Sequence, residues 1–249
     1  MQRASPVQLA RGAVLVGAVL AVLSLQTACQ SHDSAPGSAQ IAAMSARASE
    51  HDAAAERQLR EWARQGLPVA ERELGLLYRD RVERHEESVA LFEAAARSGD
   101  AEAAFQLGEL HRSALPGQSQ APRLAAPWYR MAALQHHARA ALALALLYRN
   151  GEGVARDDEQ AATWLTRASD LGDGHAMFLL ADSYTEGRGV VRDSAKGRAL
   201  LEEAAEREYA PAQQALGRTL QGGDALSRPD PQRAGLLLRQ AVAGVTPSN

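Results

Sequence analysis

Apolar positions along the chain form a short pattern that returns five times. Each copy has a leucine followed by a small residue, with more apolar residues at helical spacing. The small residues are Gly75, Gly108, Ala145, Ala181 and Gly217, and successive ones lie 33, 37, 36 and 36 residues apart. A second apolar position, with Ala four residues after it, follows 16 to 20 residues later: Leu91, Trp128, Trp164, Leu200 and Leu237. Each unit is therefore predicted to be a helix, a loop and a second helix.

The array predicted from this pattern covers residues 50–244, which is about five and a half units. The stretch from Asp52 to Gly66, with Leu59 and Trp62, has the pattern of the second helix of a degenerate first unit. One such unit cannot bury its own apolar face, so its stability has to come from stacking against its neighbours. We therefore predict an all-α fold, an α-solenoid of helix-loop-helix repeats.

The loops of two units carry the most specific signal. The segments YRNGEGVARD, from Tyr148, and YTEGRGVVRD, from Tyr184, lie 36 residues apart and share GxGV followed by Asp. They resemble the Sel1-like repeat, a tetratricopeptide-like family with the pattern LGxxYxxGxGVxxDxxKAxxWYxxAA. The resemblance implies a right-handed superhelix. Three units depart from the pattern: the second has His111 in place of Tyr, the first lacks GxG, and the fifth has Gly222-Gly223 there.

Several motif residues have a local structural reason. The small residue lets the first helix of a unit lie close to the second helix, Tyr fills the space behind it, and the loop glycines permit positive φ. Asp157 and Asp193 are placed to cap the second helices, and Gln160 is placed to complete a capping box after Asp157. Asp230 before Pro231 is the same signal in the fifth unit.

Residues 1–28 have the form of a secretory signal peptide. Arg3 and Arg11 flank a polar stretch, and residues 13–25 form an uncharged apolar run, shorter than the ~20 residues that a membrane-spanning helix needs. The run ends in LQTAC, which resembles the lipobox of bacterial lipoproteins, although Gln26 stands where that motif usually has Leu. The resemblance implies cleavage before Cys29 and lipid attachment to its thiol. An ordinary secreted protein or an uncleaved anchor is the alternative.

The expected location is the outer membrane, with the protein facing the periplasm. Gln30 is not the aspartate that signals inner-membrane retention in enterobacterial lipoproteins, and secretion to the periplasm is the alternative. Residues 29–49 are small and polar without a sustained apolar period, which predicts a flexible tether. Residues 245–249 are predicted to be a disordered tail.

Composition narrows the function. Aromatic residues make up 4% and apolar residues 46%, which favours close helix packing over a β-sandwich or barrel. There are 27 basic and 30 acidic residues, so the chain lacks the excess of positive charge that nonspecific nucleic-acid binding requires. Cys29 is the single cysteine, so the chain has neither an intrachain disulfide framework nor a cysteine-rich zinc site.

No catalytic constellation is found in the sequence. GxGV lies between predicted helices and lacks the third glycine and preceding strand of a dinucleotide site. The histidines are scattered, without an HExxH motif, and no GxSxG elbow occurs. Adjacent carboxylates such as Glu86-Glu87 fit helix starts. We expect no enzymatic activity, no metal and no cofactor.

The first helices suggest a binding surface. Positions −3, +1 and +4 from the small residue share one helix face. If that face is concave, it forms an apolar groove edged by three arginines, suited to a partner segment with carboxylates or a chain terminus. Its predicted partner-binding residues are Leu76, Arg79, Phe105, Arg112, Leu142, Leu146, Arg149 and Phe178. The alternative is that the apolar residues are inter-repeat core and the arginines a solvated face.

The sequence therefore predicts a non-enzymatic scaffold or adaptor, anchored in the bacterial envelope, that binds one or more envelope proteins and helps assemble or position a complex. Sel1-like lipoproteins include an outer-membrane alginate-export scaffold, which implies a similar role only in general terms. The alternative is a periplasmic polysaccharide-binding or export-associated protein, with arginines on uronates and tryptophans on sugars. A third class, the cysteine-rich Sel1-like proteins that bind penicillin, has a cysteine pair per repeat that this chain lacks.

Overall fold

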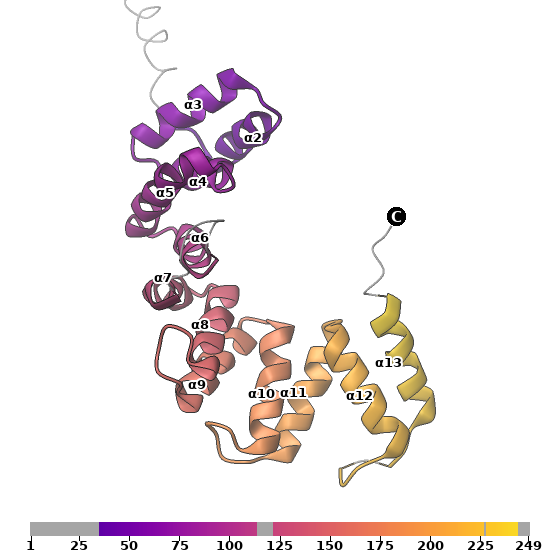
Figure 1. The fold of residues 1–249 in the computed structure, drawn as a ribbon. Helices are drawn as coiled ribbons and strands as arrows, with labels where there is room; N and C mark the ends of the chain where they lie inside the picture. Colours follow the sequence, from indigo (N-terminus) through magenta and orange to yellow (C-terminus); the bar gives the residue numbers. More distant parts are fainter. Residues whose placement is uncertain (1–34, 114–121, 227, 244–249) are drawn as a thin grey trace, which may run out of the picture. The chain divides into compact units, whose positions relative to one another are not determined.

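The computed structural model describes residues 35–113, 122–226 and 228–243, and in these ranges it is all-α with no strand (Figure 1). Its helices are α2 (Ser38–Ser49), α3 (Ala53–Arg64), α4 (Pro68–Tyr78), the 3-10 helix η1 (Val82–Arg84), α5 (His85–Arg97), α6 (Ala101–Arg112), α7 (Pro122–Leu134), α8 (Ala138–Asn150), α9 (Asp158–Asp170), α10 (Gly174–Glu186), α11 (Ser194–Glu206), α12 (Ala210–Gly222) and α13 (Pro231–Ala243). The predicted fold class is confirmed. The predicted signal peptide at residues 1–28, Cys29 and the predicted tail at 245–249 lie outside the described residues.

From α4 onward the helices pack as consecutive hairpins, all within the compact unit of residues 44–249. Five pairs, α4–α5 to α12–α13, form the repeats, and the second helix of each pair also packs on the first helix of the next. Of the helices in the described ranges, none combines the length and the apolar character that a bilayer span requires. The small residue of the sequence pattern falls on the first helix of each pair, and the second apolar position falls on the second helix.

The small residue of the pattern sets how closely the helices of a pair approach. A Cβ atom on Gly75 would lie 2.9 Å from a ring carbon of Phe92, and one on Gly108 would lie 2.5 Å from a ring carbon of Tyr129. Phe92 and Tyr129 have no exposed surface. The predicted close approach of the two helices is confirmed, and the ring that fills the space comes from the second helix.

Aspartates begin the second helices as expected. Asp157 accepts a hydrogen bond from the Gln160 amide at 2.9 Å and Asp193 one from the Lys196 amide at 3.0 Å. Asp230 accepts one from the Arg233 amide at 3.0 Å. These caps leave fewer unpaired amides in the first turn of each helix.

The capping box at Gln160 was a wrong prediction. The Asp157 amide donates to the Tyr148 carbonyl at 3.0 Å, so it does not need the Gln160 side chain. The Asp193 amide donates to the Tyr184 carbonyl at 2.8 Å in the same way. The physical reason is tertiary, because the loop folds back onto the end of the first helix and satisfies the amide there.

The tether predicted at 29–49 is corrected over its second half, which forms α2. Five of the twelve residues of α2 are alanine, the strongest helix former. Ala48 is 1% exposed, and the Ser45 hydroxyl donates to Glu73 at 2.8 Å. The polar composition of the segment concealed this helix, because few of its side chains are buried, among them Ile41 at 3% and Ala48 at 1% exposure.

The helix α3 has the contacts of a second helix, as the pattern at Asp52 to Gly66 predicts. The Arg60 guanidinium donates to the Tyr78 hydroxyl on α4, and Arg130 of α7 donates to the Tyr148 hydroxyl on α8. Both pairs are 18 residues apart. The same contact therefore joins α3 to α4 and α7 to α8.

Glu71 of α4 is a buried carboxyl without a donor. It is 8% exposed, its Oε2 accepts no hydrogen bond from the described residues, and burial raises its pKa. Gln213 has the equivalent place on α12, where its side-chain amide donates to the Ala205 carbonyl at 3.2 Å. Ala63 precedes Glu71 by the same eight residues, so a carbonyl acceptor is available near Glu71.

Glu71→Gln is therefore expected to stabilise the protein at pH 7 by about 1 kcal/mol, since it removes a buried charge and supplies a donor. The raised pKa of Glu71 fixes the sign of the pH dependence. The penalty of the charged form is present above the folded pKa and disappears as pH falls toward 4.5, the ordinary pKa of a glutamate. Urea unfolding of both proteins between pH 7 and pH 4 measures this difference, and a variant less stable than wild type at pH 7 would contradict it.

Candidate functional site

Five of the eight predicted groove residues lie together on the surface of α4, α6 and α8. Two cavities adjoin there, one of about 310 Å³ between α6 and the residues that directly follow α4, and one of about 320 Å³ between α6 and α8. Phe105, Glu109 and Arg139 line both cavities, and we call the joint surface the groove. The predicted residues in it are Arg79, Phe105, Arg112, Leu142 and Leu146.

The other three predicted residues lie elsewhere. Leu76 is half-buried and packs against the main apolar core. Phe178 lines a third cavity, of about 430 Å³, among α10, α11 and α12. Arg149 lies at the junction of α8 and α10. The structure therefore does not bring all eight residues to one cavity.

The apolar part of the groove comes from α6 and α8. Phe105 is 3% exposed and forms the floor, while Leu142 and Leu146 are half-buried and line the cavity wall with Ala143. Leu142 and Ala143 precede Leu146 by four and three residues, so these three side chains share one face of α8. The groove is therefore an apolar surface that remains open to solvent at its edges.

The predicted arginines of the groove are already engaged within the chain. Arg79 donates to Gln106 of α6 at 3.1 Å and forms an ion pair with Asp80 at 3.3 Å. Arg112 forms an ion pair with Glu109 at 3.0 Å, and its Nε donates to the Tyr129 hydroxyl at 3.2 Å. These contacts neutralise Arg79 and Arg112, two of the three arginines that the sequence pattern predicted to bind carboxylates of a partner.

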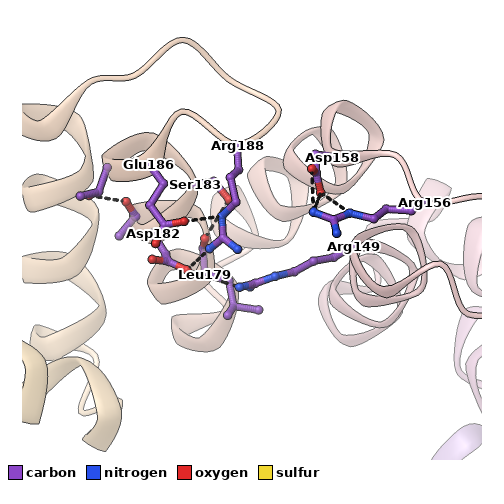
Figure 2. A network of polar contacts seen from close by, with 10 residues as sticks. Arg149, Arg156, Asp158, Leu179, Asp182, Ser183, Glu186 and Arg188 are labelled. Atoms are coloured by element: carbon purple, nitrogen blue, oxygen red, sulfur yellow. Dashed lines mark hydrogen bonds and ion pairs between the residues drawn. The ribbon is translucent and has the colours of Figure 1, made fainter.

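Arg149 belongs to a separate network of polar contacts (Figure 2). Its guanidinium is 3.3 Å from Asp182 of α10, and Arg188, from the loop after α10, pairs with the same carboxylate. Arg188 is also 2.9 Å from Glu186. Asp182 thus holds two arginines and joins the third repeat to the fourth, which is a structural role for Arg149.

A histidine links α6 to the start of α8. His137 stacks on Phe105 with ring centroids 4.8 Å apart, and its Nδ1 accepts from the Ala140 amide at 3.1 Å. With Nδ1 as acceptor, the proton is assigned to Nε2, which is 2.9 Å from Glu102. This hydrogen bond lowers the pKa of Glu102 to about 2. Glu102 is therefore ionised at neutral pH, and its carboxylate already accepts hydrogen bonds from His137 and Gln106.

Sequence reasoning missed Arg139, the remaining arginine of the groove. Its guanidinium carbon lies 4.6 Å from the centroid of the Phe105 ring, and the residue is exposed. Within the described ranges, no carboxylate lies within ion-pair distance of it. Arg139 is three residues before Leu142, so extending the helix-face pattern by one turn would have included it.

The described residues offer no arrangement typical of catalysis. Among them, no three His, Cys, Asp or Glu side chains gather as metal ligands. Of the three tryptophans considered for sugar stacking, Trp62 is 8% and Trp164 6% exposed, while Trp128 is half-buried. Arg130 and Arg167 lie over the Trp164 ring, each 5.6 Å from its centroid.

The stacked helix pairs define a class of protein, an all-α repeat solenoid. The family model described as Sel1 repeat matches residues 68–100, 101–137, 138–173, 174–209 and 210–244, which are the five helix pairs. The chain belongs to the Sel1 repeat family. Sel1 repeat proteins are generally protein-interaction scaffolds, and the fold is typically non-catalytic.

Solved structures agree with this assignment. A Sel1 repeat protein from Oxalobacter formigenes is 26% identical with a TM-score of 0.73, and the match covers 88% of this chain and 93% of that one. A protective antigen of uropathogenic Escherichia coli with an SLR fold is 29% identical with a TM-score of 0.68. That match covers 76% of this chain but only 41% of the antigen. Comparison with curated proteins gave no match.

Proposed function

We propose that this protein is an adaptor of the bacterial cell envelope that holds a segment of a partner protein in the groove. The observation that carries the proposal is the pair of adjoining cavities on α4, α6 and α8, which share three lining residues. Apolar side chains at the floor and polar ones at the edges are the usual composition of a peptide-binding surface. Membership of a family of interaction scaffolds supports the same function.

The envelope location rests on the sequence before the repeats. An apolar run at residues 13–25 followed by Cys29 is the pattern of a lipid-anchored, exported protein. On this proposal the lipid at Cys29 holds the chain at the outer membrane, and the groove faces periplasmic partners. Processing that is sensitive to globomycin and lost in Cys29→Ala supports the anchor, whereas unchanged processing contradicts it.

Site-specific crosslinking tests the groove. Asn150 lines the α6–α8 cavity and Ser113 the α4–α6 cavity, and both residues are exposed. Replacing each in turn with photoreactive benzoylphenylalanine in the producing bacterium is expected to crosslink the same partner protein from both positions. Val191, which is 88% exposed and lines none of the described cavities, is the control position. Crosslinks that are absent, or equal from Val191, would contradict the proposal.

A further inference from the structure

The groove has three arginines, and their charges are not equivalent. Arg79 is paired with Asp80, and Arg112 with Glu109. Arg139 has no ion-pair partner among the described residues, although it lines both cavities. The unpaired positive charge of the groove is therefore at its centre, where the two cavities meet.

The Arg139 guanidinium is held in place without being neutralised. It lies over Phe105, whose ring is itself fixed by His137 at 4.8 Å and Tyr129 at 5.9 Å between centroids. A cation over an aromatic face loses little of its charge and keeps its N–H donors free at the edge. Because the side chain is already positioned, pairing with a ligand carboxylate requires less loss of conformational entropy.

The carboxylates around Arg139 are committed to other donors. Glu102 is hydrogen-bonded to His137 and Gln106, and the His137 hydrogen bond is the largest cause of its lowered pKa, with Arg139 a smaller one. Glu109 is bound by Arg112 and by the Tyr129 hydroxyl. Neither carboxylate is therefore free to move onto Arg139 without breaking these contacts.

The apolar wall begins one helical turn after Arg139. Leu142 and Leu146 line the α6–α8 cavity, whose volume of about 320 Å³ holds an aliphatic or aromatic side chain. In an extended peptide, side chains two residues apart lie on the same face at about 7 Å, which suits a charge and an apolar group separated by one turn of α8.

We propose that the groove recognises an extended peptide segment that presents one carboxylate to Arg139 and a neighbouring apolar side chain to the α6–α8 cavity. This proposal rests on the proposed function and specifies the chemistry of the partner. The segment carries a single acid, not a run of acids, because Glu152, a carboxylate without an ion-pair partner among the described residues, lines the α6–α8 cavity and repels further negative charge.

Selection from a library of displayed random dodecapeptides against the full chain tests the proposal. The enriched peptides are expected to share one Asp or Glu within two residues of Leu, Ile, Val, Met or Phe. A representative peptide is expected to bind about tenfold more weakly to Arg139→Gln, because a charge-assisted pair at an exposed site is lost. Arg57→Gln, at an exposed arginine of α3 that lines none of the described cavities, is the matched control and should bind as wild type.

A double-mutant cycle separates a direct pair from an indirect effect. Asp→Asn or Glu→Gln in the peptide should weaken binding to wild type about tenfold and binding to Arg139→Gln hardly at all. Equal losses on both proteins would overturn the assignment of Arg139. Circular dichroism spectra and melting temperatures verify that Arg139→Gln is folded.

Failure of this proposal and failure of the proposed function give different results. Peptides that are enriched without an acid, and that a benzoylphenylalanine at Asn150 still crosslinks, overturn the carboxylate requirement alone. Peptides that crosslink only outside the groove, or a selection without enrichment, overturn both. The measured outcome therefore identifies which of the two statements is wrong.

Discussion

Gly189→Ala is expected to lower the free energy of unfolding by about 3 kcal/mol. Gly189 has a φ of +70°, and a Cβ atom there would lie 1.9 Å from the Asp158 carbonyl oxygen at the start of α9. Left-handed backbone costs a residue with a side chain about 1 to 2 kcal/mol, and forcing backbone atoms apart in a packed interface adds about 1 to 3 kcal/mol. Equilibrium unfolding in urea, followed by circular dichroism, measures the change.

Gly187→Ala is the matched control in the same loop. Its φ of +74° is equally left-handed, but the nearest atom to an added Cβ is the Arg192 Cβ at 3.3 Å. Only the backbone strain remains, so the expected loss is about 1.5 kcal/mol. Equal losses from the two substitutions would show that the loop does not press on α9 as the structure has it.

Phe92→Ala is expected to destabilise the protein by about 4 kcal/mol, the middle of the range for a fully buried phenylalanine. Phe92 has no exposed surface and lies against Gly75 of the facing helix. The exposed Leu236, at 49% exposure on α13, is the comparison, because Leu236→Ala should change stability by less than about 0.5 kcal/mol. Urea unfolding of both variants provides the test.

The same pair predicts a change of sign for a second substitution. Gly75→Ala in the wild-type chain gains about 1 kcal/mol of helix propensity but presses a methyl group to 2.9 Å from the Phe92 ring, for an expected net loss of about 1 kcal/mol. In the Phe92→Ala background the ring is gone, and Gly75→Ala should stabilise by about 1 kcal/mol. Additive effects in this cycle would be evidence that the two residues do not touch.

The repeat fold was readable from the sequence because its signal is periodic. The small residues, such as Gly75 and Gly108, and the aspartates, such as Asp157 and Asp193, return at nearly constant spacing. Such a recurrence is improbable by chance. Their structural roles, close helix contact and helix capping, also depend on neighbours in sequence. The capping box at Gln160 failed where a contact from outside the helix intervened, since the Tyr148 carbonyl takes the Asp157 amide.

The candidate site was only partly readable. The helix-face pattern placed Leu142 and Leu146 on one face of a helix, because they are four residues apart, and the repeat register gave Phe105 the position equivalent to Leu142 on the preceding first helix. It could not say that Arg149 would meet Asp182, 33 residues away. The Arg112–Glu109 pair, by contrast, joins residues three apart on α6, a spacing that the sequence already shows. Pairing across a helix interface depends on which side chains approach there, and no local pattern reports it.

The sequence by itself determined the repeat, its length of about 36 residues, the helix order and the small residues at which helices touch. All of these follow from periodicity and local backbone preference. Only the tertiary structure decided that residues 38–49 form a helix, that Arg149 pairs with Asp182 of the next repeat, and that Arg139 has no ion-pair partner among the described residues. The reason is physical: these outcomes depend on contacts between segments that are distant in sequence, which the order of residues along one helix does not contain.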